Sequence, residues 1–132
     1  MESTLKDLAG DHRSIEAALD RFGESLASRR LDTALFEEIR EAIAEHYRRE
    51  EQFLARLQAH EPALAAKLQA QHEEVLEIAA GLEEALTTGD PGDIGYLARR
   101  FLAIAQHNMI EEERDVFPLA ERCFSAEGAP PS

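Results

Sequence analysis

The residues best suited to chemistry in this chain are histidines and glutamates on four amphipathic segments. Four of the five histidines fall one on each segment, and His46 and His107 are each followed four residues later by a candidate ligand glutamate. Residues i and i+4 share a helix face, so the ring and the carboxylate of each pair point the same way. Neutral imidazole binds a metal through one nitrogen, and a carboxylate can bridge two metals. The pattern therefore predicts a metal centre. Its expected ligands are His12, His46, Glu50, His72, His107 and Glu111.

The number and type of these donors predict two metal ions. Shared equally, they give each metal two imidazoles and one oxygen from each of two bridging glutamates. An oxo or hydroxo bridge derived from solvent adds a fifth donor, which leaves one position of an octahedral iron open for a small ligand. Mixed nitrogen and carboxylate donors suit iron or manganese, and zinc can substitute. The other di-iron bundle pattern, Glu-x-x-His, is absent, because no histidine here has a glutamate three residues before it.

Some assignments stay open or fall outside the predicted site. Glu112 can replace Glu111 as a ligand if its helix is turned slightly about its own axis. His60 lies about 21 Å from His46 along the helix axis, so we expect it at the surface or at a cap. Cys123 has no basic or histidine neighbour in the sequence to activate it, and we interpret it as structural. No residue identifies a catalytic group, so the sequence does not decide whether the protein is an enzyme.

Four helices are expected to position these side chains. Apolar residues and histidines recur three and four residues apart, and no alternating run rich in Val, Ile and Thr suggests a strand. Short connections favour antiparallel neighbours. The predicted fold is therefore all-α, an up-down-up-down antiparallel four-helix bundle over residues 1–127, followed by a disordered tail at 128–132.

Capping residues and turn residues predict the helix boundaries. The first helix is expected over about residues 3–29, and Asp32 is the expected N-cap of the second. Pro62 suits the first turn of the third helix. The run from Gly89 to Gly92 is a break, after which Asp93 is expected to cap the fourth helix.

Helical rise predicts that the six candidate ligands lie in one layer of the bundle. At about 1.5 Å per residue, all six lie between about 11 and 17 Å above the same end of the bundle. The register of the fourth helix is expected to slip near Pro118. Its inward-facing stripe is predicted to be Leu97, Phe101, Ile104, His107 and Glu111, then Val116 and Leu119.

Composition limits the class of protein. A chain of 132 residues suits one domain with a single core. It has no apolar run of about 20 residues for a membrane span, and no secretion signal, so we expect no membrane association. One cysteine cannot form an internal disulfide, which predicts a cytoplasmic protein. The net charge of −13 argues against nucleic acid as a partner.

The order and spacing of four motifs resemble the hemerythrin-like, or HHE cation-binding, domain family over nearly the whole chain. The motifs are Asp11-His12-Arg13, His46-Tyr47-Arg48-Arg49-Glu50-Glu51, Gln71-His72-Glu73 and the run from His107 to Pro118. This resemblance implies a four-helix bundle around a non-haem di-iron centre. The ligand positions that it implies are His12, His46, Glu50, His72, His107 and Glu111.

The resemblance also shows where this chain departs from the oxygen carriers. Oxygen-carrying hemerythrins have a second histidine one turn from the first on the third helix, whereas Leu68 and Leu76 flank His72 here. The set of four histidines and two glutamates is instead similar to the di-iron domain of bacterial iron–sulfur-cluster repair proteins. Those proteins carry an additional N-terminal domain with cysteines that is not part of this sequence. We therefore expect neither reversible oxygen carriage nor complete repair activity from these residues alone.

Three functions remain compatible with the predicted centre. The first is binding or sensing of a small diatomic ligand, oxygen or nitric oxide, at an open iron position. The second is redox catalysis, such as peroxidase or nitric-oxide-reducing activity, with peroxide or the diatomic as substrate and an unidentified redox partner. The third is iron storage or delivery. The sequence does not indicate an oligomeric state.

Overall fold

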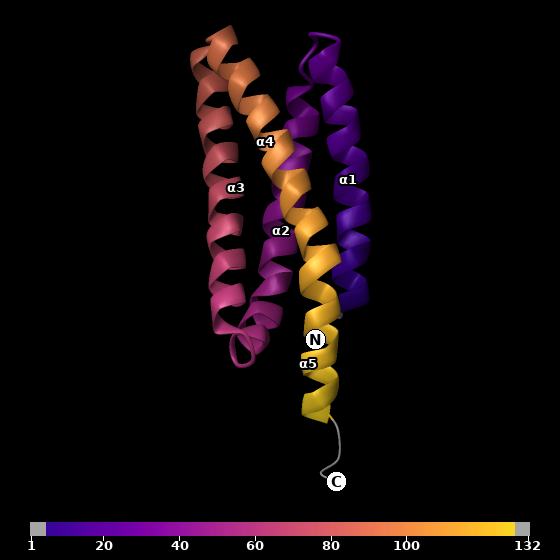
Figure 1. Cartoon of the computed structure of the whole chain (residues 1–132). Coiled ribbons are helices and arrows are strands. Elements are labelled where there is room, and N and C mark those ends of the chain that lie inside the picture. The colour runs from indigo at the N-terminus through magenta and orange to yellow at the C-terminus, as the bar shows by residue number, and fades with distance from the viewer. Residues whose placement is uncertain (1–4, 129–132) are drawn as a thin grey trace.

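The computed structural model describes residues 5–128, and helices make up almost all of this part of the chain (Figure 1). Within it, no helix has the length and apolarity needed to cross a bilayer. The last predicted helix is observed as three consecutive pieces, the middle one a π-helical turn. The elements are α1 (Leu5–Ala27), α2 (Thr33–Gln58), α3 (Pro62–Thr88), α4 (Pro91–Glu111), η1 (Glu112–Val116) and α5 (Phe117–Gly128).

The helices pack as a four-membered bundle in which each is antiparallel to the next. Helix α1 packs against α2 and α4, and α3 packs against the same two. Figure 1 shows the chain running along the bundle in alternating directions from α1 to α4, with α5 continuing α4. The all-α, up-down-up-down prediction is confirmed. The predicted disordered tail begins at Gly128, which the structure includes in α5; the rest of it, 129–132, lies outside the described residues.

The helix starts follow local capping chemistry, with one correction to the sequence-based prediction. The Asp32 carboxylate accepts a hydrogen bond from the Leu35 amide, as expected of an N-cap. The prediction that Asp93 caps α4 is wrong, because Asp90 is the N-cap. Its carboxylate accepts from the amides of Gly92 and Asp93. Pro91 fits the first turn behind it, because its fixed φ is already helical and its missing N–H has no partner to lose there.

The predicted slippage near Pro118 is observed as the π-helical turn η1. The Phe117 amide donates to the Glu112 carbonyl, five residues back. Pro118 has no amide to donate, and its ring would clash with the Arg114 carbonyl in a regular α-helix. The wider turn accommodates that proline and changes the direction in which side chains beyond Glu112 point.

The core has two apolar clusters with a polar layer between them. One, which we call the upper cluster, contains Ile15, Ile43, Val75 and Ala105. The other, which we call the lower cluster, contains Leu8, Phe53, Leu68 and Val116. On every helix the buried histidines and glutamates fall between a residue of the upper cluster and a residue of the lower one. The polar groups are thus held by a packed apolar scaffold on both sides.

The upper cluster is centred on three phenylalanines and predicts a large stability effect. Phe101 is fully buried and packs edge-on against Phe36, with ring centroids 5.3 Å apart, and against Phe22 at 6.3 Å. Phe101→Ala should lower the free energy of unfolding by about 3–5 kcal/mol. Denaturation with urea measures this loss. Leu76→Ala is the control, because Leu76 is exposed and its loss should cost about 0.5 kcal/mol. Equal effects would contradict this description of the core.

Candidate metal centre

The polar layer is formed by five buried side chains, one or two from each of the four helical segments that surround it. Each is at most 3% exposed. Helix α1 contributes one histidine, α2 a histidine and a glutamate, α3 one histidine, and η1 one glutamate. They are His12, His46, Glu50, His72 and Glu112.

Two histidines and one oxygen of each glutamate meet at one end of this cluster, which we call the His12–His46 pole. The two Nε2 atoms lie 2.9 Å apart. His12 Nε2 is 3.8 Å from Glu50 Oε1 and 3.7 Å from Glu112 Oε1, and His46 Nε2 contacts the same Glu50 oxygen. Ligand atoms of these four residues lie within 4.8 Å of one another, close enough to hold one metal ion.

The other oxygens of both glutamates face His72, which we call the His72 pole. His72 Nε2 is 3.2 Å from Glu50 Oε2 and 3.4 Å from Glu112 Oε2. Each carboxylate therefore presents one oxygen to each pole. This is the arrangement that a bridging carboxylate needs.

Unsatisfied polar atoms indicate that the cluster fits a cation. Both oxygens of Glu50 and Glu112 Oε1 face into the cluster and are buried, and none makes a hydrogen bond of good geometry. Burying such groups unpaired costs free energy, and buried charges in proteins are paired or coordinate metals. Imidazole nitrogens and carboxylate oxygens are ligands of iron, manganese and zinc.

The pKa values show that ionisation of one carboxylate opposes ionisation of the other when no cation lies between them. Burial, together with the charge of Glu50, raises the pKa of Glu112 to about 8. Burial also opposes ionisation of Glu50, but the close imidazoles of His12, His46 and His72 outweigh it and hold the pKa of Glu50 well below its usual value. One carboxylate is thus ionised at the expense of the other, and a cation between them would allow both to ionise.

The structure does not bring His107 and Glu111 into this cluster. The His107 side chain is 69% exposed, and its Nε2 lies 3.2 Å from Glu111 Oε2. Lys67 Nζ donates to Glu111 Oε1 at 2.7 Å, and Gln71 donates to Glu111 Oε2 at 3.1 Å. The Glu111 carboxylate is therefore satisfied by these neighbours, and Glu112 occupies the place expected for Glu111. This is the alternative that the sequence left open.

The difference arises because the buried stripe of α4 is displaced from the predicted one. Of the predicted stripe, Phe101 is fully buried, whereas Leu97 and Ile104 are half-buried at the edge of the upper cluster. Alanines, which allow the helices to approach closely, lie at the centre instead. The same spacing of three and four residues is present on this face, so it was visible in the sequence. The observed stripe is Ala98, Phe101, Ala105, Asn108 and Glu112.

Asn108 is a residue near the site that sequence reasoning missed. The Tyr47 ring stacks on His72, with centroids 3.8 Å apart and planes 10° apart. The Tyr47 hydroxyl donates to Asn108 Oδ1 at 3.1 Å, and Asn108 Nδ2 donates to Gln71 at 3.3 Å. Asn108 therefore fixes the ring that covers His72. In the sequence, the sign of this role is the position of Asn108 on the stripe that contains Ala98 and Ala105.

The residues expected away from the site do lie away from it. His60 is exposed, and its ring packs 6.3 Å from the ring of Phe124, beyond the lower cluster. Cys123 is a free thiol, half-buried on α5.

Comparison with known proteins agrees with the geometry of the cluster. Residues 3–128 match the family model described as the hemerythrin HHE cation binding domain. None of the curated proteins and none of the solved structures compared with the chain matched it.

Proposed function

Because the chain belongs to the hemerythrin HHE cation-binding family, we propose that it holds two iron ions in the buried cluster and binds a small diatomic ligand there. The expected ligands are His12 and His46 at one pole, His72 at the other, and Glu50 and Glu112 between them. Manganese and zinc are the expected substitutes.

The observation that carries this proposal is the orientation of the two carboxylates. Glu50 and Glu112 each direct Oε1 toward the His12–His46 pole and Oε2 toward His72. A single ion at the His12–His46 pole would leave Oε2 of each glutamate with His72 as its only close partner among the described residues. Two ions would give a cation to all four oxygens.

The donor count supports ligand binding at the iron. Three imidazoles and two carboxylates provide fewer donor atoms than two octahedral ions require, so positions remain for solvent or a small molecule. Iron would supply redox chemistry and affinity for oxygen or nitric oxide. The chain's own contribution is to exclude bulk water through the two apolar clusters and to hold the donors in place. Among the described residues no group identifies a reductant, which favours binding or sensing over catalysis.

The test is to add nitric oxide to the iron(II)-loaded protein without oxygen. We expect a stable adduct, seen as a new visible absorption band, whose amplitude saturates in proportion to the bound iron. The control, His60→Ala, should give the same band, because His60 lies outside the cluster. Consumption of nitric oxide or peroxide in the presence of a reductant would instead show a redox enzyme. Iron that binds without any adduct would contradict ligand binding.

A further inference from the structure

The outer nitrogens of the two histidines at the His12–His46 pole both face carboxylates. His46 Nδ1 lies 3.0 Å from Asp11 Oδ2. His12 Nδ1 lies 3.5 Å from Glu113 Oε1. The Nε2 atoms of both rings point into the cluster, so each carboxylate is on the side of its ring away from the expected metal.

An arginine lies beside each of these carboxylates. Arg49 Nη1 donates to both oxygens of Asp11, at 2.9 and 3.1 Å. Arg13 lies 3.7 Å from Glu113. Asp11 is thus fixed more firmly than Glu113, because it makes short hydrogen bonds on both sides.

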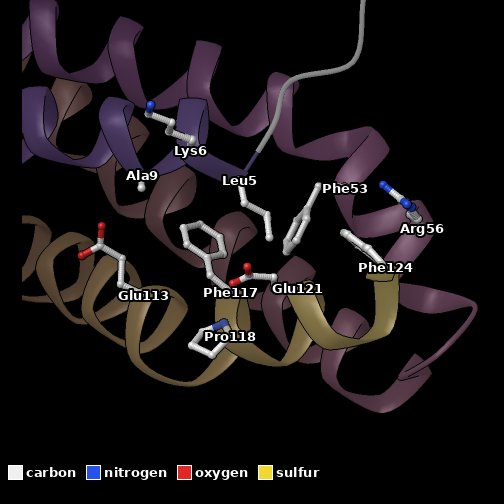
Figure 2. Close-up of a pocket in the computed structure, with 10 residues that line it drawn as sticks. All are labelled: Leu5, Lys6, Ala9, Phe53, Arg56, Glu113, Phe117, Pro118, Glu121 and Phe124. Carbon is white, nitrogen blue, oxygen red and sulfur yellow. The ribbon is translucent and has the colours of Figure 1, made fainter. Parts of the chain in front are cut away.

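Packing fixes the orientation of the His12 ring as well. Phe117 stacks on His12, with ring centroids 5.4 Å apart and planes 23° apart. Figure 2 shows Phe117 and Glu113 on the wall of a surface groove that Phe53 and Phe124 also line. Phe117 thus contacts both the His12 ring and this groove, whereas His12 itself is fully buried.

The His72 pole has no equivalent carboxylate among the described residues. The ion-pair contacts of His72 are with Glu50 and Glu112, both through Nε2. Its ring is backed by the neutral phenol of Tyr47. The two poles therefore differ in donor number and in the charge behind their histidines.

We propose that Asp11 is a positioning residue that makes the His12–His46 pole the tighter and first-filled of the two metal sites, and that the negative charge of Glu113 beside His12 adds to this effect. A carboxylate at Nδ1 holds the single proton of a neutral imidazole there and leaves the Nε2 lone pair for the metal. It also makes the ring a stronger donor. This inference rests on the proposed function, since it concerns the order in which two ions bind.

The experiment is a titration of the metal-free protein with cobalt(II), followed by its visible absorption. Wild type should bind two ions in two steps of different affinity. His72→Ala should abolish the weaker step alone. Asp11→Asn should weaken the tighter step by about 10- to 100-fold and change the position or intensity of its band, because the charge behind His46 is lost. Asp20→Asn is the matched control, since Asp20 is an exposed aspartate on the same helix.

The outcomes separate this inference from the proposed function. Two ions that bind with equal affinity, or an Asp11→Asn variant that binds and absorbs like wild type, would overturn the inference but leave the two-metal site intact. Equal weakening of both steps would show a structural role for Asp11 and would also overturn it. Failure of wild type to bind cobalt in the cluster would remove the proposed function itself. Circular dichroism of each metal-free variant verifies that it has folded.

Discussion

Glu50→Gln should abolish tight binding of both metal ions, because the two oxygens of this one carboxylate face the two poles. An amide is a neutral and much weaker ligand, so each pole loses an anionic donor. Loss of even an outer partner of a metal ligand costs about 10- to 100-fold in affinity, so loss of a bridging ligand should cost more than about 100-fold.

Stability measurements report this loss directly. A ligand at one hundred times its dissociation constant stabilises a folded protein by about 2.7 kcal/mol. Iron(II) or cobalt(II) at that excess should therefore raise the urea midpoint of wild type and leave that of Glu50→Gln unchanged. Glu51→Gln, at the exposed neighbouring position, should respond like wild type. A Glu50→Gln variant that metal stabilises as much as wild type would show that binding takes place elsewhere.

Two adjacent glutamates, the last residue of α4 and the first of η1, should give opposite results. Glu112→Gln should lose metal at both poles, for the same reason as Glu50→Gln. Glu111→Gln should retain both ions, because its carboxylate is held by Lys67 and Gln71 outside the cluster. Metal content after gel filtration of the loaded variants measures the difference.

His107→Ala extends this comparison to the fourth histidine of the predicted set. With its side chain 69% exposed, His107 should be dispensable for tight binding, whereas His72→Ala should lose one ion. If Glu111→Gln and His107→Ala lost metal while Glu112→Gln kept it, the stripe predicted from the sequence would be the functional one. The face of α4 through Ala98 and Ala105 would then not be the one that leads to the metal site.

Sequence periodicity was sufficient to predict the first three helices. In α2, every residue of the predicted stripe is buried, from Ile39 to Leu57. Large apolar residues occupy that face almost without interruption, so the apolar stripe and the buried stripe coincide. The same holds for His12 on α1 and His72 on α3, which is why one layer could be located by helical rise alone.

The fourth helix was harder to predict because two stripes with the same spacing compete on it. The stripe through Leu97 and Ile104 has larger side chains, whereas the stripe through Ala98 and Ala105 allows closer packing. The larger side chains made the stripe through Leu97 and Ile104 the expected buried face. In the fold the stripe through Ala98 and Ala105 is buried, because it lets the neighbouring helices pack closely. The position of Glu112 at the start of the π-helical turn follows from that choice.

The carboxylates behind the histidines could not be predicted from the sequence. Asp11 precedes His12, yet its partners are His46 and Arg49 on α2, 35 and 38 residues away in the chain. Such contacts depend on the rotation of two packed helices about their axes. Periodicity defines that rotation only to within about one residue.

The number of iron ions bound per chain tests the central claim most directly. After anaerobic loading with iron(II) and removal of the excess, metal analysis should find two ions per wild-type chain. It should find essentially none in the double variant Glu50→Gln/Glu112→Gln. Equal iron content in the two proteins, or none in wild type, would contradict a two-metal centre bridged by these carboxylates.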